Sequence, residues 1–154
     1  MLRTIKSNIS LISPTDIIIV PIQIQYDNSE DEINSVEIKL TYENITYRGS
    51  GKDHLWVDAF ADLQRKLPSA IRLACCMTCR HGNMCPYGNK ENQLYCTKDV
   101  HITSKYSIIE LMNDKGFDSF FEREVSSIHC CDDFIYQSDD YYTYNDYLYH
   151  LQKN

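Results

Sequence analysis

Proline and glycine are scarce in this chain, and long apolar runs are missing altogether. Only four Pro and five Gly occur among 154 residues, which argues against a low-complexity or disordered chain. No stretch approaches the ~20 consecutive apolar residues that a membrane-spanning helix needs. Residues 1–6 also lack the apolar segment and cleavage site of a signal peptide. We therefore expect a cytoplasmic protein that makes no use of a membrane.

Positive charge is also in short supply. The chain has 15 Lys and Arg against 22 Asp and Glu, a formal net charge of −7. Residues 106–154 carry most of the excess, with ten acidic and three basic residues, whereas residues 60–105 hold seven basic and three acidic residues. Nucleic-acid binding draws its affinity largely from neutralised phosphates. An acidic chain of this kind is a poor general nucleic-acid binder, and we expect a protein partner instead.

The N-terminal part predicts an antiparallel sheet. Residues 17–26 are rich in β-branched residues, and Pro21 suggests an edge or a bulge there. Apolar and polar residues alternate over 36–42 and again over 45–48, with Glu43 and Asn44 between them as a two-residue turn. This alternation predicts a hairpin with one buried face.

A helix is expected directly after this hairpin. Residues 49–51, Gly-Ser-Gly, should break the strand, and Asp53 is placed to cap the helix. Asp62 and Lys66 form a favourable pair four residues apart. The apolar residues at helical spacing are Leu55, Trp56, Ala59, Phe60, Leu63 and Leu67. Their stripe should pack on the buried face of the hairpin.

The remaining elements are short. Residues 70–74 and 94–97 look like strands on either side of a cysteine-rich loop, and residues 106–113 and 117–125 look like helices. A last helix is expected from Tyr144 to Leu151, with Thr143 and Asp146 as a capping pair. The fold class is then α+β in a single domain. Its three parts are a β-hairpin plus helix (1–68), a zinc-ribbon-like cysteine hairpin (69–99) and a helical, acidic, tyrosine-rich part (100–154).

Seven cysteines in a reducing compartment indicate metal binding rather than disulfides. Cys76 and Cys79 form a Cys-x-x-Cys turn, in which two thiolates can face one ion. Cys96 follows Cys79 after sixteen intervening residues, as expected for the return strand of a ribbon-like hairpin. Zinc prefers four such ligands in a tetrahedron, with Zn–S near ~2.3 Å. These three cysteines therefore predict a structural zinc site that lacks one ligand.

The fourth ligand must come from elsewhere, and we choose Cys131 because a polar turn follows it. Cys130, Cys85, His81 and His129 stay open as alternatives. A ligand this remote would tie the C-terminal third to the N-terminal hairpin and helix. The unused cysteines would be small buried hydrophobes, and the basic residues expected to offset the thiolate charge are Arg72, Arg80, Lys90 and Lys98.

Other uses of the cysteines fit the spacing less well. An iron–sulfur cluster on Cys76, Cys79, Cys85 and Cys96 matches neither common ferredoxin spacing. A His-Glu-x-x-His motif is absent, as is the His-x-Glu partner of a deaminase. Residues 80–83 are a poor helix start for a thioredoxin-like dithiol. No catalytic residue is therefore assigned, and a metalloenzyme or redox protein is kept as the alternative to a non-enzymatic protein.

The C-terminal tyrosines have two interpretations. Six of them crowd the tail: Tyr136, Tyr141, Tyr142, Tyr144, Tyr147 and Tyr149. Tyr144 and Tyr147 have helical spacing, so the first interpretation places them on a C-terminal helix that packs on the rest of the protein. The others suit a partner-binding surface, because tyrosine is enriched at interfaces and acidic residues attract basic partners.

Several of these segments carry a resemblance. The run Gly49-Ser50-Gly51-Lys52-Asp53 with its helix is similar to small bacterial immunity-type proteins. The Cys76-x-x-Cys79 turn, Pro86-Tyr87-Gly88-Asn89 and residues 142–148 resemble an uncharacterised cysteine-containing bacterial domain family. The resemblance brings neither a family function nor catalytic residues. From the metal site and the acidic surfaces we expect a metal-stabilised interaction or accessory protein that binds a protein partner.

Overall fold

The computed structural model describes residues 1–29, 32–52, 55–88 and 93–153, and the chain divides into two compact units. The first unit comprises residues 1–74 and 146–154, and the second comprises residues 75–145. The boundary thus falls directly before the first cysteine, and the last residues return to the first unit. The helix cap expected at Asp53 and the basic neighbour expected at Lys90 lie outside the described residues.

The first unit is built on a five-stranded antiparallel sheet in the order β4-β3-β2-β1-β5. Its strands are β1 (Leu2–Ile12), β2 (Ile17–Ser29), β3 (Glu32–Tyr42), β4 (Ile45–Gly51) and β5 (Arg72–Ala74). Ile24 pairs with Ile5 on one side and with Ile38 on the other. Alternation along β2 and β3 buries the face that contains Ile24 and Ile38, as period-two patterns require.

The predicted hairpin is confirmed as β3 and β4. Glu43 and Asn44 both have positive φ, 50° and 65°, which is the conformation of a type I′ turn. Pro21 lies just beyond the last β2–β3 pair, Ile22 with Leu40. Among the described pairs, β2 is paired only with β1 at Pro21. The N–H that proline lacks therefore falls at a position without a β3 neighbour.

Residues 49–51 do not break the strand, contrary to expectation, because β4 continues to Gly51. The two glycines serve helix packing instead. A Cβ on Gly49 would lie 2.3 Å from the Ala59 carbonyl oxygen, and one on Gly51 would lie 1.8 Å from that of Leu55. Glycine here permits a close approach between strand and helix backbones.

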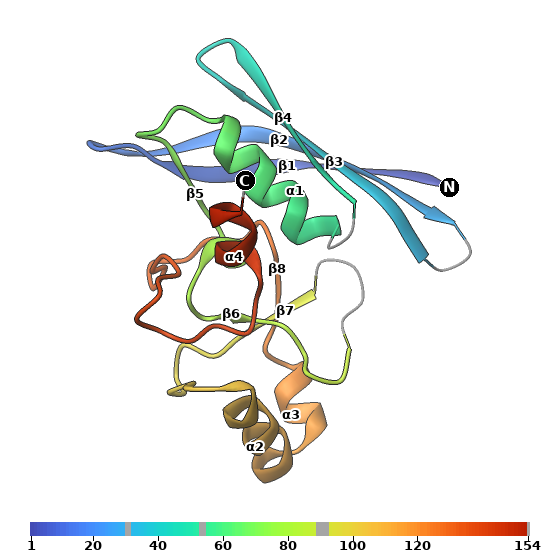
Figure 1. Ribbon diagram of the computed structural model, residues 1–154, viewed down its shortest axis with the longest axis vertical. Helices are drawn as coiled ribbons and strands as arrows, with labels where there is room; N and C mark the ends of the chain where they lie inside the picture. The colour runs from blue at the N-terminus through green and yellow to red at the C-terminus, as the bar shows by residue number, and fades with distance from the viewer. Residues whose placement is uncertain (30–31, 53–54, 89–92, 154) are drawn as a thin grey trace. The chain divides into compact units, whose positions relative to one another are not determined.

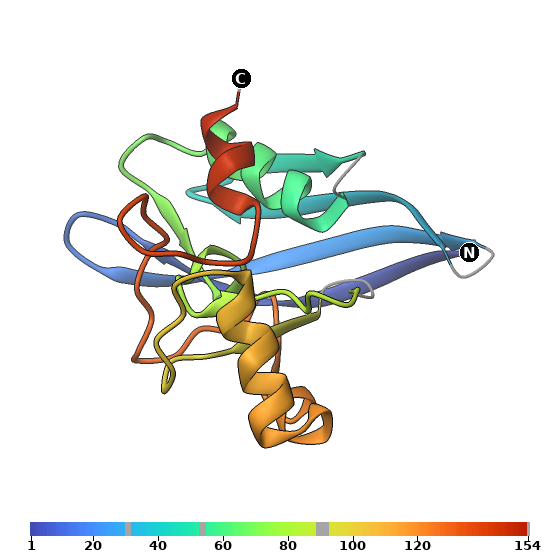
Figure 2. The same cartoon turned by 60° about the horizontal axis from the view of Figure 1, so that its bottom comes forward.

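Helix α1 (Leu55–Lys66) packs on β3 and β4, and helix α4 (Tyr147–Gln152) packs on α1 (Figures 1 and 2). The side chains of Trp56, Phe60 and Leu63 are buried, which confirms the predicted apolar stripe. Arg65 donates a hydrogen bond of 2.6 Å to the His150 carbonyl, and His150 Nδ1 lies 3.0 Å from an Asp58 carboxylate oxygen. These contacts tie α4 to α1.

The last helix begins at Tyr147 and not at Tyr144, so the expected capping pair is wrong. The Thr143 hydroxyl donates to the Arg80 carbonyl at 2.8 Å instead. A hydroxyl that satisfies a backbone carbonyl of another segment is not available to cap a helix.

The second unit combines a small sheet with short helices. Its sheet has the order β6-β7-β8, and all pairs are antiparallel. The elements are η1 (Cys76–Thr78, a 3₁₀ turn), β6 (Gly82–Asn83), β7 (Gln93–Cys96), α2 (Lys105–Lys115), α3 (Phe117–Phe121) and β8 (Glu124–Ser126). The helix expected over 117–125 therefore ends early and gives way to a strand. The core of the second unit includes Tyr95, Ile108, Met112 and Phe120.

The α+β class is confirmed, but the zinc-ribbon-like hairpin is not found. The strand that should have opened it, β5, pairs with β1 in the large sheet. The strand that should have closed it, β7, pairs with β6 and β8. Short strands carry little pairing information of their own, so tertiary packing selects their partners.

None of the helices in the described parts of the chain is long and apolar enough to cross a membrane.

Candidate functional site: a cavity lined by cysteines

The first two cysteines of the candidate site lie on a tight turn. The N–H of Cys75 donates to Thr78 Oγ1 at 3.2 Å, and the N–H of Cys79 donates to the Cys76 carbonyl at 3.3 Å. The His81 N–H points at Cys79 Sγ, 3.5 Å away. The turn thus places the Cys76 and Cys79 thiols next to each other and directs a backbone donor at one sulfur.

Strand pairing brings the third cysteine to this turn. Gly82 in β6 pairs with Cys96 in β7. A Cβ on Gly82 would lie only 2.1 Å from the Cys76 carbonyl oxygen. Only a glycine allows β6 to pass so close to the turn, and β6 in turn positions Cys96.

A later segment supplies the fourth. Residues 131–134 form a turn closed by a 3.1 Å hydrogen bond from the Phe134 N–H to the Cys131 carbonyl. The chain then pairs with the cysteine turn through a bridge between Tyr136 and Cys79, and the Arg80 N–H donates to the Ile135 carbonyl at 2.8 Å. This pairing carries Cys131 to the other three cysteines.

All four predicted ligands line one small cavity of about 20 Å³. The lining residues are Cys76, Cys79, His81, Gly82, Cys96, Lys98, Val125, Cys131 and Asp133. Within the described ranges, no group of three or more His, Cys, Asp or Glu side chains is placed so that it could hold a metal ion. The thiols therefore share a cavity, and side-chain rotations would have to bring the sulfurs to ~2.3 Å from an ion.

The alternative cysteines lie elsewhere in the second unit. Cys75 is fully buried, and Cys85 belongs to the core around Phe120. Both are small buried hydrophobes, as expected for unused cysteines. Cys130 directs its S–H toward the Cys131 carbonyl at 3.8 Å. His129 contributes its carbonyl, which accepts a 2.7 Å hydrogen bond from the Cys76 N–H.

Burial and mutual repulsion act on the thiols of Cys76 and Cys79. Burial, followed by the neighbouring thiols of Cys75, Cys79, Cys96 and Cys131, raises the pKa of Cys76. Burial also raises the pKa of Cys79, although the N–H groups of Ile135 and His81 act in the opposite direction. Several thiolates this close repel one another in a poorly solvated site. A bound cation would attract each thiolate and so offset the repulsion between them.

Charged groups surround the cavity. Lys98 lies in its lining and forms a 2.8 Å ion pair with Asp133. Hydrogen bonding to Asp133 raises the pKa of Lys98, with smaller contributions from Cys131 and Cys96. Arg123 donates to the Cys96 carbonyl at 3.1 Å and pairs with Asp99. Of the expected basic neighbours, Lys98 is thus at the cavity and Arg80 follows Cys79, whereas Arg72 belongs to the first unit.

His81 faces the same cavity as the cysteines. Burial, together with Arg80 and Lys98, lowers the pKa of its imidazole, so the ring is neutral at neutral pH. Its Nδ1 atom is buried and has no hydrogen-bond partner among the residues that the structure covers. A neutral imidazole is a metal ligand, so His81 competes with Cys131 as a fourth ligand.

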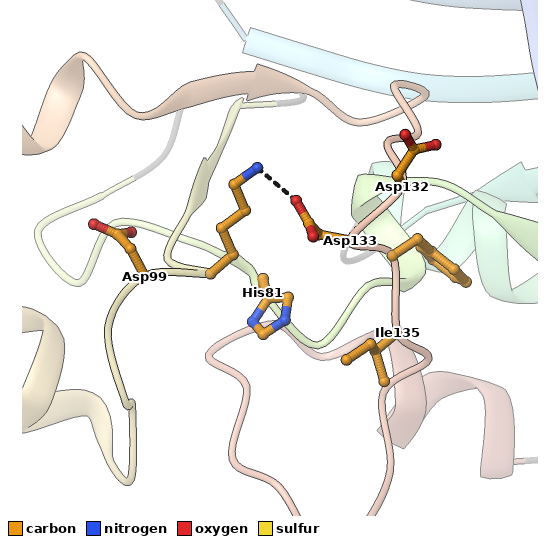
Figure 3. Close-up of a pocket in the computed structure, with 7 residues that line it drawn as sticks. His81, Asp99, Asp132, Asp133 and Ile135 are labelled. Atoms are coloured by element: carbon orange, nitrogen blue, oxygen red, sulfur yellow. Dashed lines mark hydrogen bonds and ion pairs between the residues drawn. The ribbon is translucent and has the colours of Figure 1, made fainter.

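A wider pocket of about 500 Å³ opens beside the cysteines (Figure 3). His81, Asp99, Asp132, Asp133 and Ile135 are among its lining residues, and the Lys98–Asp133 ion pair lies at its wall. Because His81, Lys98 and Asp133 also line the small cavity, the two spaces share a wall.

Three buried amide side chains hold the site together, and the sequence patterns did not reveal them. Asn145 Nδ2 donates to the carbonyls of Met77 and Gly82 at 3.0 and 3.1 Å. Gln137 Nε2 donates to the Met77 carbonyl at 2.9 Å. Asn83 Nδ2 donates to Thr97 Oγ1 at 2.7 Å. Polar residues carry no periodic signal when they are buried for hydrogen bonding, so only tertiary contacts identify this role.

No family model and no curated protein matches the chain.

Proposed function

We propose that this is a small interaction protein whose second unit is stabilised by a structural zinc ion bound to Cys76, Cys79, Cys96 and Cys131. The observation that supports the proposal is that these four cysteines, from three separate segments, line one cavity. Thiolates are preferred zinc ligands, and four of them complete a tetrahedral structural site. A site closed in this way has no open coordination position for a substrate.

The placement of the cysteines favours one zinc ion over a cluster. The four cysteines considered for an iron–sulfur cluster match neither common ferredoxin spacing, and one of them, Cys85, lies in the core around Phe120. Four thiolates and one Zn²⁺ carry a formal charge of about −2, since each thiolate contributes one negative charge. Lys98 in the cavity lining partly offsets that charge.

The role of such an ion would be to join segments of the second unit. All four cysteines belong to residues 75–145, so the ion would link the turn, β7 and the 131–134 turn. The sequence had suggested that the ion ties the C-terminal third to the N-terminal hairpin and helix. With all four cysteines in one unit, the ion would not form that link. Binding of a structural zinc contributes ~10–16 kcal/mol in small zinc-finger peptides, more than the whole net stability of many domains.

The proposed binding function is inferred from the negative charge of the chain. The chain carries a net charge of −7, and residues 106–154 hold ten acidic and three basic residues. Such a surface attracts basic protein partners and speeds their association. A partner-binding accessory protein of the immunity type fits this balance.

Metal analysis of the purified protein tests the zinc site. We expect one zinc per chain and no absorption in the visible range. The Co²⁺-substituted protein should show the absorption bands of tetrahedral thiolate coordination. A brown protein would indicate an iron–sulfur cluster, and a folded, metal-free protein that binds no Co²⁺ would contradict the proposal.

Adjacent cysteines supply a matched pair of variants. Cys131→Ser should lose the metal, whereas Cys130→Ser should retain it, because only Cys131 lines the cavity. His81→Gln should also retain it if the four cysteines are the ligands. Metal loss in Cys130→Ser with retention in Cys131→Ser would reverse the assignment.

A further inference from the structure

Exposed aromatic rings form a row on the second unit. Tyr87, Phe117 and Phe121 are 64%, 49% and 46% exposed, although residues of this kind are usually buried. The Tyr87 and Phe117 rings meet edge to face with centroids 6.0 Å apart. Phe117 and Phe121 are four residues apart on α3, which places them on the same side of that helix.

One ring of the row, Phe121, packs against the core of the second unit. The Phe121 ring lies 5.9 Å from the rings of both Tyr95 and Phe120. Tyr95 and Phe120 are buried and lie 4.7 Å apart. Phe121 is therefore supported by buried neighbours, and little of its side-chain entropy would be lost when a partner covers it.

Three exposed carboxylates stand near these rings along the chain. Asp118 and Glu122 directly follow Phe117 and Phe121, and Glu124 is two residues further on. All three are exposed. The ion pairs in the described part of this unit join Lys98 to Asp133 and Arg123 to Asp99, and none of them involves these three carboxylates. Glu124 pairs with Tyr95 between β7 and β8, and the Tyr95 ring in turn contacts the Phe121 ring.

We propose that the patch of Tyr87, Phe117, Phe121, Asp118, Glu122 and Glu124 binds an arginine-rich segment of a protein partner. A guanidinium group stacks on an aromatic face and donates two parallel N–H hydrogen bonds to a carboxylate. This patch offers both within a few residues. The inference rests on the proposed binding function and names its partner chemistry, but it does not require the zinc ion.

The charge of the patch decides against two other occupants. Nucleic-acid bases also stack on aromatic rings, but such sites need a positive groove for the backbone. Aromatic residues also enter lipid headgroups, but three carboxylates would be repelled by an anionic membrane surface. A basic peptide is the occupant for which both the rings and the carboxylates are favourable.

The test is a titration of the full-length, metal-loaded chain with a hexa-arginine peptide, followed by amide NMR shifts. We expect the largest shifts in residues 85–88 and 114–124. A hexa-lysine peptide of equal charge should bind at least threefold more weakly, because lysine stacks less well on rings. Equal binding of both peptides, or shifts centred on residues 132–140, would overturn the proposal.

Two tyrosines of equal exposure make the matched variants. Tyr87 and Tyr149 are both 64% exposed, but only Tyr87 belongs to the patch. Tyr87→Ala should weaken hexa-arginine binding about three- to fivefold, in line with exposed cation–π contacts, and Tyr149→Ala should leave it unchanged. Asp118→Asn with Glu122→Gln should weaken it further and flatten its salt dependence. Equal effects of the two tyrosine variants would contradict the role of the patch.

Zinc content, measured on the same samples, separates this inference from the proposed metal site. Patch variants that keep one zinc but bind hexa-arginine as wild type does would overturn the patch alone. A chain that binds hexa-arginine at the patch but holds no metal would overturn the zinc site alone.

Discussion

Gly82 occupies the tightest position beside the cysteine cavity. A Cβ there would meet the Cys76 carbonyl oxygen at 2.1 Å, and a backbone atom cannot move aside as a flexible side chain can. We expect Gly82→Ala to destabilise the protein by about 1–3 kcal/mol, the usual range for overpacking. It should also weaken Co²⁺ binding, because Gly82 pairs with Cys96. Urea unfolding and a Co²⁺ titration measure the two effects.

Gly49 provides the control for this variant. Its Cβ would meet the Ala59 carbonyl oxygen at 2.3 Å, a clash of similar severity within the first unit. Gly49→Ala should therefore destabilise the protein with Co²⁺ affinity unchanged. If Gly82→Ala bound Co²⁺ as well as wild type does, the inferred link between β6 and the cysteine turn would be wrong.

The residues of the proposed metal site show which roles can be recognised from single positions in the sequence. Cysteine spacing selected Cys76, Cys79 and Cys96 and left the fourth ligand open, with Cys131 preferred for the polar turn after it; these four line one cavity. Their supporting amides, Asn83, Gln137 and Asn145, were missed. An amide side chain looks the same in a sequence whether it is solvated or buried on a carbonyl, because its role depends on groups far along the chain.

At the scale of elements, Asp62 links α1 to β4. Its carboxylate accepts 2.9 Å hydrogen bonds from the Ser50 N–H and from Lys66 Nζ. Burial acts to raise the pKa of Asp62, but the Ser50 N–H, Lys66 and Arg65 together lower it. A lowered folded-state pKa contributes stability above the unfolded pKa of ~3.9, and that stability is lost as the pH falls through the folded value.

We therefore expect Asp62→Asn to destabilise the protein by about 1 kcal/mol at pH 7, a hydrogen-bond-sized effect reduced by solvent screening. The difference from wild type should shrink below about pH 4, where the wild-type carboxyl also becomes protonated. Urea unfolding at pH 7 and pH 3 measures it, with the exposed Glu110→Gln as control. A difference that stays constant with pH would contradict the inferred ionic role.

Gly116 sets the angle between α2 and α3. Its φ of 88° and ψ of 151° fall in a region that is essentially restricted to glycine. A Cβ there would meet no atom within 4 Å, so the cost of Gly116→Ala is backbone strain alone. We expect a loss of about 1–3 kcal/mol in thermal or urea unfolding. A neutral Gly116→Ala would show that the α2–α3 turn relaxes freely.

The strands also show how far local patterns reach. The β3–β4 hairpin and α1 were predicted because alternation, turn residues and helical spacing all act within a few residues. Strand β1 was missed, although Ile5, Ile9 and Leu11 alternate with polar residues along it. The choice of partners by β5 and β7 lay beyond sequence reasoning, since three- or four-residue strands are recruited by packing.

At the scale of the whole molecule, the division into two units makes the proposed zinc a local stabiliser. All four cysteines fall within residues 75–145. We expect removal of the metal by EDTA to abolish the hydrogen-exchange protection of the second unit, while the sheet of the first unit keeps most of its own. Amide exchange by mass spectrometry, with and without EDTA, resolves the two. Uniform loss of protection over both units would show that they fold as one.

The sequence by itself determined the features that depend on near neighbours. These are the β3–β4 hairpin, the helix after it, the α+β class, and the cysteine pair at Cys76 and Cys79. Tertiary structure alone decided that Cys131 rather than Cys130 faces the cavity, that Gly49 and Gly51 stay within a strand, and that buried amides brace the cysteine turn. Period-two and period-3.6 patterns encode which face of an element is buried. Contacts between distant segments depend on how those faces pack together, and no local pattern carries that information.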